Sequence, residues 1–227
     1  MPINIGLVPV ISDPNAVAKL NFHPPVINPT ALTTQLRFDD ANINDGTVVN
    51  SIYATNGIQL AKLTASTPTA GIVLPDPNAN GPVYARAYHP AQPNNRNLIS
   101  LVPNTSSNST YPTDSSFDER IGIIQISFSN PVRFAAVFAI GVPQLEGALV
   151  SHAKVYIRAF DSQNNLIHEN DYPMWDPATT TQAPGFGTWM QLSCISTSAN
   201  IRYLLLSSTA PATGGHLGAA FDTLIYM

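Results

Sequence analysis

The sequence predicts an all-β protein, a two-sheet antiparallel β-sandwich that follows a proline-rich, extended N-terminal arm. Three observations lead to this prediction. Apolar and polar residues alternate over many short runs, which is the pattern of strands with one buried face. The chain holds 20 prolines among 227 residues, which are too many for long helices. Clusters of Asn, Asp, Ser, Gly and Pro separate the runs, as turns separate the strands of a sandwich.

The prolines divide the chain into an arm and one domain. Six of them fall within the first 30 residues: Pro2, Pro9, Pro14, Pro24, Pro25 and Pro29. We expect residues 1–30 to be extended, with at most a short helix near residues 15–20. Residues 31–227 show no internal repeat and no further boundary, and we expect them to form a single β-sandwich domain. Arms of this kind often wrap a neighbouring molecule, so the arm suggests a homo-oligomer.

The alternation predicts the strands in chain order. The clearest runs are residues 122–128, 132–140 and 153–160. In the second run, one face that we expect to be buried carries Val132, Phe134, Ala136, Phe138 and Ile140. Asp161-Ser-Gln-Asn-Asn165 then predicts the turn of a hairpin. Shorter runs predict the other strands at residues 34–38, 47–53, 57–63, 71–74, 98–102, 166–169, 188–193, 201–207 and 219–226.

Three stretches without alternation are expected to be long loops: residues 75–97, 104–119 and 171–187. Long loops in a compact domain are often functional. The candidate ligand-binding residues lie in two of them: Tyr84, Arg86, Tyr88, Trp175 and Asp176. An aromatic ring can stack on the C–H face of a sugar, while charged side chains bind its hydroxyls. The alternative is that the aromatic residues fix the loops to the sandwich by burying about 150–250 Å² each.

The composition argues against several classes of protein. Charged residues make up 11% of the chain, against about 25% in typical soluble domains. The net charge is −4 and no basic residues cluster, so we expect no nucleic-acid partner. No apolar run approaches the roughly 20 residues of a membrane-spanning helix. The single cysteine, Cys194, lies in an apolar run and is expected to be a small core residue.

The expected location is outside the cell, in a secreted or cell-surface protein. The chain is low in lysine and rich in asparagine and threonine, as many exported proteins are. The first residues lack the basic region of a signal peptide. A cytoplasmic location therefore stays open at this point.

Two segments resemble a known family. Residues 38–58 read FDDANINDGTVVNSIYATNGI, and residues 221–225 read FDTLI. The first resembles the opening of jelly-roll domains in bacterial exported proteins. The second resembles the last strand of galactose-binding-like sandwiches and carbohydrate-binding modules. The resemblance covers roughly residues 34–227 and implies a jelly-roll sandwich, but a fold by itself does not fix a function.

The resemblance also implies a structural calcium ion where the first and last strands meet. The carboxylates that would hold it are Asp39, Asp40, Asp45 and Asp222. Calcium takes six to eight oxygen ligands, so backbone carbonyls would complete such a site. The alternative is that Asp45 belongs to an ordinary turn and that Asp39 or Asp40 caps backbone amides.

These features favour a non-catalytic, lectin-like module that binds carbohydrate. The first alternative is a structural or adhesion protein, such as a surface, matrix or virion component, and the arm favours it. A hydrolase acting on glycans is the second alternative. It has little support, because the Gly-x-Ser-x-Gly and His-Glu-x-x-His motifs are absent and Glu119, Glu146 and Glu169 show no catalytic pairing.

Overall fold

The computed structural model describes residues 33–38, 43, 46–63, 72–87, 97–100, 123–142, 154–173, 189–209 and 218–227. These residues form strands and one short 3-10 helix, and no helix among them is long and apolar enough to cross a membrane. The elements in chain order are β1 (Thr34–Leu36), η2 (Ala54–Asn56), β2 (Ile58–Leu63), β3 (Tyr84–Ala87), β4 (Asn97–Ser100), β5 (Ile123–Val132), β6 (Phe134–Val142), β7 (Lys154–Phe160), β8 (Leu166–Pro173), β9 (Trp189–Ile195), β10 (Ile201–Thr209) and β11 (Gly218–Tyr226).

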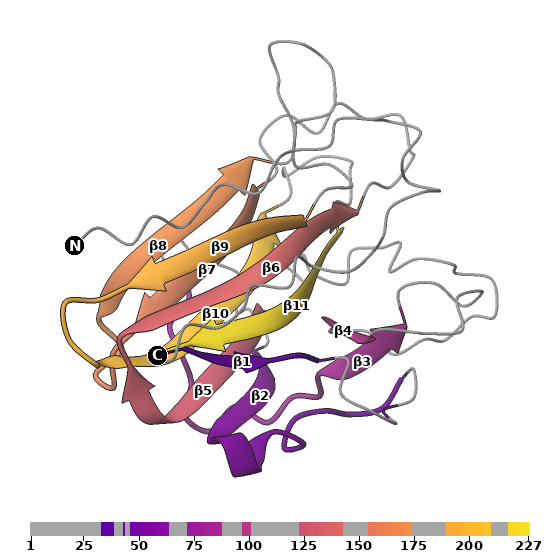
Figure 1. Cartoon of the computed structure of the whole chain (residues 1–227), viewed down its shortest axis with the longest axis horizontal. Coiled ribbons are helices and arrows are strands. Elements are labelled where there is room, and N and C mark those ends of the chain that lie inside the picture. The colour runs from indigo at the N-terminus through magenta and orange to yellow at the C-terminus, as the bar shows by residue number, and fades with distance from the viewer. Residues whose placement is uncertain are drawn as a thin grey trace.

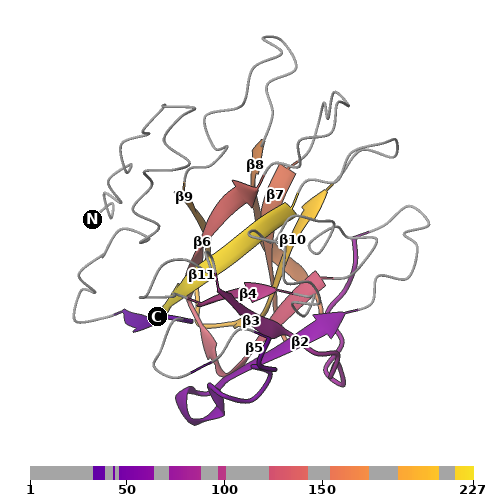
Figure 2. The same cartoon turned by 90° about the vertical axis from the view of Figure 1, so that its right-hand side faces the viewer.

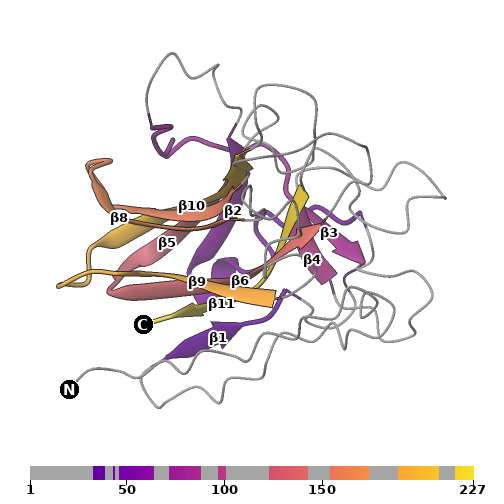
Figure 3. The ribbon, with the colours of Figure 1, turned by 90° about the horizontal axis from the view of Figure 1, so that it is seen from above.

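The strands form two antiparallel sheets that lie face to face (Figures 1 and 3). Sheet A has the order β3-β4-β11-β6-β9, and β1 also pairs with β11. Sheet B has the order β2-β5-β10-β7-β8. From β5 onward the chain crosses repeatedly from one sheet to the other, as in a jelly roll. The predicted two-sheet β-sandwich is therefore confirmed.

The main core lies between the two sheets and contains the residues for which the alternation predicted burial. Ile124 and Ile126 of β5 and Ile157 of β7 are fully buried. They pack in one cluster with Val137 of β6 and Leu224 of β11 from the other sheet. Burial of each such side chain contributes about 1.5–3 kcal/mol, so this cluster holds the sheets together.

Phe134, Ala136 and Phe138 of β6 are buried as predicted, but they lie outside the core between the sheets. Ala135, Val137 and Ala139 lie in the core between the sheets. Phe134 and Phe138 lie in a second cluster on the outer face of sheet A. The chain turns at Arg133 from β5 in one sheet to β6 in the other, which reverses the side on which the core lies. Both faces of β6 are apolar, so period alone could not identify the inner one.

The predicted strand at residues 71–74 is wrong. Residues 72–80 have no regular structure and lie on the outer face of sheet B, where Val73 and Ala79 pack against an apolar cluster. The side chain of the buried Gln125 on β5 bonds to the backbone of this segment, as a neighbouring strand would. Its Oε1 accepts from the Asp76 amide at 2.9 Å and its Nε2 donates to the Asp76 carbonyl at 2.9 Å.

The predicted strand at residues 47–53 is also wrong. This segment forms only an isolated bridge at Val48 and then turns into η2. Asn50 explains the difference, because its side chain bonds to backbone groups of residues 81 and 83 that a paired strand would otherwise bond. Its Oδ1 accepts from the Val83 amide at 2.8 Å and its Nδ2 donates to the Gly81 carbonyl at 2.9 Å.

The hairpin between β7 and β8 turns where the sequence predicted. Asp161 Oδ1 accepts from the amides of Gln163 at 2.9 Å and Asn165 at 2.8 Å. Asn164 adopts a left-handed conformation with φ of 63°, which asparagine tolerates better than most residues. The Asn164 side chain donates to the Pro75 carbonyl at 3.1 Å, so the turn also fixes the segment over sheet B.

Asp161 should make the stability of the protein depend on acid pH. The side-chain hydrogen bond from Asn165 lowers the pKa of Asp161 below its usual 3.8, against a smaller opposing effect of burial, and the two amide bonds lower it further. A carboxylate with a lowered folded-state pKa stabilises the fold above its unfolded pKa. That contribution is lost as the pH falls through the folded pKa. We expect Asp161→Asn to reduce the acid-dependent loss of stability below about pH 4, as measured by urea unfolding at several pH values. An unchanged pH profile would contradict this assignment.

Candidate functional site

Two of the five predicted ligand residues lie on a strand and not in a loop. Tyr84 and Arg86 belong to β3, the last strand of sheet A, so the expected loop at residues 75–97 is interrupted there. Tyr84 pairs with Ser100 and Arg86 pairs with Leu98 of β4. Residues two apart on a strand occupy the same face of the sheet. The fold therefore brings an aromatic and a cationic residue together on one face.

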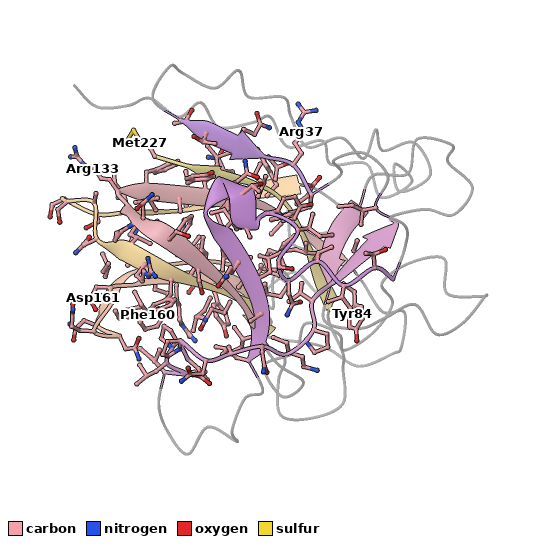
Figure 4. The ribbon with its side chains drawn as sticks, turned by 90° about the horizontal axis from the view of Figure 1, so that it is seen from below. Arg37, Tyr84, Arg133, Phe160, Asp161 and Met227 are labelled. Atoms are coloured by element: carbon pink, nitrogen blue, oxygen red, sulfur yellow. The ribbon has the colours of Figure 1, made fainter. Side chains whose placement is uncertain are left out.

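Tyr84 is partly exposed, and its neighbour Ala85 is buried. Figure 4 shows Tyr84 at the end of the molecule away from Arg133 and Asp161. The other ligand candidates, Tyr88, Trp175 and Asp176, lie outside the described residues. The structure thus places the backbones of Tyr84 and Arg86 two residues apart on β3, and the grouping of all five stays a prediction.

Another aromatic and charged cluster lies on the outer face of sheet B. The Arg158 guanidinium lies 4.0 Å from the centre of the Tyr156 ring and pairs with Glu169 of β8. Sequence reasoning did not single out this cluster, although the alternation of β7 placed Tyr156 and Arg158 on one face. Tyr156 is 2% exposed, so its ring cannot offer a face to a sugar. The cluster joins β7 to β8 instead.

The candidate calcium site lies where the first and last strands meet, and this meeting is confirmed. β1 pairs with β11 from Thr34 opposite Tyr226 to Leu36 opposite Leu224. Asp222 lies on β11 and is 1% exposed. Asp39, Asp40 and Asp45 lie outside the described residues. Of the four predicted ligands, the structure therefore describes Asp222 alone.

Strand β11 is irregular at this point. Its register with β6 shifts between Asp222 and Leu224, and the intervening Thr223 has φ of 49°. A β-branched residue in this left-handed region costs about 1–3 kcal/mol, and such strain gathers at functional sites. The Thr223 amide donates to Oδ1 of the preceding residue, Asp222, at 2.6 Å. The bulge therefore fixes a buried carboxylate in a strained turn of the strand.

At the bulge, β11 changes its neighbour from β4 to β1, and Figures 1 and 2 show these three strands together. β4 pairs with β11 at Phe221, just before the bulge, whereas β1 pairs with it from Leu224, just after the bulge. The chain leaves β1 through the buried Phe38, which directly precedes Asp39. Phe38, the residue before Asp39, and Phe221, the residue before Asp222, thus lie in the same core cluster.

Thr223 is the residue that sequence reasoning missed. Its Oγ1 is the one buried side-chain N or O atom without a hydrogen-bond partner among the described residues. A hydroxyl buried without a partner costs about 1–3 kcal/mol, and an oxygen-seeking cation would offset that cost. No sequence pattern marks a β-bulge, so only the backbone conformation could have revealed it.

Asp222 and Thr223 would be the described part of a calcium site. Both supply oxygen, which calcium prefers, and both are buried. The described residues contain no group of three or more His, Cys, Asp or Glu side chains that could hold a metal ion. A complete site would need the carboxylates of Asp39, Asp40 or Asp45.

Cys194 is a core residue, as predicted. It is fully buried in the cluster between the sheets. Burial, and after it the negative charge of Glu169, raise the pKa of its thiol to about 12. Because the thiolate is the reactive form, this raised pKa and the burial both oppose reaction of Cys194 in the folded protein.

Comparison with known proteins gives structural similarity only. No family model and no curated protein sequence matches the chain. The K1 and K2 cleaved adhesin domains of Lys-gingipain, the first from Porphyromonas gingivalis W83, are 12% and 8% identical, with TM-scores of 0.32 and 0.35. The matches cover 86% and 87% of this chain and 97% and 99% of those chains.

A third similar structure is TmCBM61, solved in complex with β-1,4-galactotriose. It is 8% identical, has a TM-score of 0.30, and the match covers 86% of this chain and 88% of that one. Adhesin and carbohydrate-binding domains are thus among the similar structures. At these TM-scores the sandwich assignment rests on the strand pairing of the chain itself.

Proposed function

We propose that the protein is a non-catalytic module that binds carbohydrate through the outer face of β3 and the loops that continue from it. The observation that carries this proposal is the pair Tyr84 and Arg86 on one face at the end of sheet A, beside Ser100. An aromatic ring offers a sugar its apolar face, while a guanidinium and a hydroxyl bind sugar oxygens. Tyr88, which follows β3 directly in the chain, would extend this surface, whereas Trp175 and Asp176 follow β8, which lies at the other edge of the sandwich, and stay separate predicted ligand residues.

The composition supports a neutral ligand. With 11% charged residues and a net charge of −4, the chain depends on amides and hydroxyls for its polar surface. Such groups match the hydroxyls of a neutral sugar better than they match a phosphate or a polyanion. A secreted or cell-surface location would suit this function.

A glycan array followed by calorimetric titration of the full chain tests the proposal. Arg86→Ala should weaken binding roughly tenfold to a hundredfold, since a hydrogen bond to a charged group contributes about 1.5–3 kcal/mol. Tyr84→Ala should weaken binding by a similar factor. Tyr84→Ala should melt near the parent temperature, because Tyr84 is only partly buried, and Arg86→Ala should do so if Arg86 serves the ligand and not the fold.

Two control substitutions separate binding from folding. Arg202→Ala removes a partly exposed arginine from β10 of the other sheet and should leave binding unchanged. Tyr226→Ala removes a ring that packs against the core and should lower the melting temperature without weakening binding by the folded fraction. If no glycan binds, or if Arg86→Ala and Arg202→Ala bind equally well, the structural or adhesion alternative is favoured. Release of shorter sugars during the titration would indicate a hydrolase.

We also propose that a calcium ion stabilises the junction of β1, β4 and β11. Asp222 and the unpartnered Thr223 hydroxyl support it, and Asp39, Asp40 and Asp45 would supply the remaining charge. A ligand that binds only the folded state stabilises it by mass action, by about 2.7 kcal/mol at one hundred times its dissociation constant. The melting temperature should therefore be higher with calcium than with a chelator.

Asp222→Asn is the matched variant for this experiment. It retains an oxygen that can accept from the Thr223 amide but removes the negative charge that calcium needs. We expect the difference between calcium and chelator to disappear in this variant, while its melting temperature in chelator stays close to that of the parent. Identical melting of the parent with calcium and with chelator would refute the metal site.

A further inference from the structure

The outer face of sheet A carries an apolar cluster that no described element covers. Phe134, Ala136 and Phe138 of β6 pack there with Ile225 of β11 and with Met227. Sheet B lies on the other side of sheet A, across the main core (Figure 3). Ala136 is nevertheless fully buried, Phe138 is 1% exposed and Ile225 is 5% exposed. Since the described layers leave this face open, its cover has to come from a segment outside them.

The burial is centred on β11 and β6. One cross-strand row on this face runs from Gln35 of β1 through Ile225 and Ala136 to Ser193 of β9. The two middle residues are buried, whereas Gln35 and Ser193 are partly exposed. Ile195, two residues farther along β9, is 53% exposed. The covered strip therefore ends before the β9 edge and lies one strand away from β1.

The N-terminal arm, residues 1–30, joins sheet A beside this strip. β1 begins shortly after the arm, and its first residue, Thr34, stands opposite Tyr226 of β11. Figure 1 shows the start of β1 next to the C-terminus, where Met227 packs against the cluster. Thirty extended residues span up to about 100 Å, and the cluster occupies only about 13 Å of β6. The arm thus starts at the face and is long enough to cross it.

The composition of the arm suits burial on an apolar face. Of its 30 residues, only Asp13 and Lys19 are charged. Its six prolines have no amide hydrogen, so fewer donors would be left without a partner on a surface of side chains. Proline also restricts the free chain, which reduces the entropy lost on docking. Large apolar residues occur along the whole arm: Ile3, Ile5, Leu7, Val8, Val10, Ile11, Val17, Leu20, Phe22, Val26 and Ile27.

We propose that residues 1–30 dock in cis on the outer face of sheet A, over Phe134, Phe138 and Ile225. The tether favours the chain's own arm, because a linked segment has an effective concentration in the millimolar range. The arm of a second copy would need a comparable protein concentration to displace it. Exchange of arms between two copies, which the sequence suggested, is the competing arrangement.

Photo-cross-linking in the full chain identifies the segment that covers the face. A benzophenone amino acid in place of Gln35 or Ser193 stands at one end of the cross-strand row and replaces a partly exposed side chain. We expect the cross-linked peptides to come from residues 1–30, in a product with the mass of one chain. Gln59 is the matched control position, because it is exposed on the outer face of sheet B. It should not cross-link to the arm.

Every other product would overturn the proposal. Cross-links that join two chains would indicate exchange of arms. Cross-links to residues 143–153 or 174–188 would indicate that another segment covers the cluster. If neither position cross-links to the arm, the arm does not dock on this face.

Deletion of residues 2–30 tests the energetic contribution of the contact. Phe138→Ala should lower the urea midpoint less in the shortened chain than in the full chain, because the arm no longer packs on that ring. Phe160→Ala is the matched control, since its ring lies in the cluster on the outer face of sheet B. Its effect should be the same in both chains. Equal effects of Phe138→Ala in the two chains would contradict docking, and if the shortened chain does not fold, the cross-linking result decides alone.

Discussion

Asn50→Ala is expected to lower the free energy of unfolding by about 3 kcal/mol, because it leaves the Val83 amide buried without a partner and removes the bond to the Gly81 carbonyl. Val83 is fully buried, so water cannot readily replace the lost acceptor. For a chain of this length the change corresponds to roughly 6–12 °C in melting temperature. Urea unfolding monitored by circular dichroism measures it directly.

Asn50→Asp separates the two contributions. The carboxylate still accepts from the Val83 amide, which lies 2.8 Å from the Asn50 Oδ1 in the parent. When ionised it can no longer donate to the Gly81 carbonyl and repels that oxygen, whereas a protonated carboxyl can donate to it. We therefore expect a smaller loss than for alanine at acid pH, where the carboxyl is protonated. Equal losses in the two variants at that pH would show that Val83 is not the group that makes Asn50 important.

Gly81→Ala is expected to cost about 3 kcal/mol, near the upper end for an overpacked site. An added Cβ would lie 2.5 Å from the Lys62 carbonyl oxygen and 2.9 Å from the Lys62 Cβ. The Gly81 carbonyl accepts from the Lys62 amide at 2.8 Å, so the two backbones cannot separate without losing that bond. Because backbone atoms meet the new methyl group, rotation of a side chain cannot relieve the contact.

Gly46→Ala is the matched control for Gly81→Ala. Gly46 has φ of 84°, but nothing lies within 4 Å of an added Cβ. Alanine at this position must adopt the left-handed conformation but meets no other atom, so the free energy of unfolding should fall by only about 1–2 kcal/mol. The comparison therefore isolates the steric effect at Gly81. If the two variants lost equal stability in urea, the close approach of residues 62 and 81 would not matter.

The sequence predicted most of the strands because their period is a local property. The alternation in residues 153–160 and the turn chemistry of Asp161 depend on neighbours in the chain, and the structure confirms both. The errors occur where a side chain takes over a backbone role. Asn50 and Gln125 pair with distant backbone segments. Such long-range bonds leave no periodic signal in the sequence.

The candidate site could be predicted only in part, because some of its features depend on contacts between strands that are distant in the sequence. Asp222 could be named because its segment resembles a terminal strand, and the pairing of β1 with β11 agrees with that. The strained conformation and unpartnered hydroxyl of Thr223 depend on the change of neighbour from β4 to β1 along β11. A single sequence does not specify that change. Arg86 was named as a loop residue, and its place beside Leu98 emerged from the sheet register.

The position of β11 has a consequence for the biosynthesis of the protein. Its nine residues, 218–226, lie in the interior of sheet A and pair with β1, β4 and β6. During translation all three partner strands leave the ribosome before the strand that joins them. Sheet A can therefore close only after β11 has been synthesised, and its apolar surfaces stay uncovered until then. The chain that still lacks β11 is the state most exposed to aggregation and to chaperones.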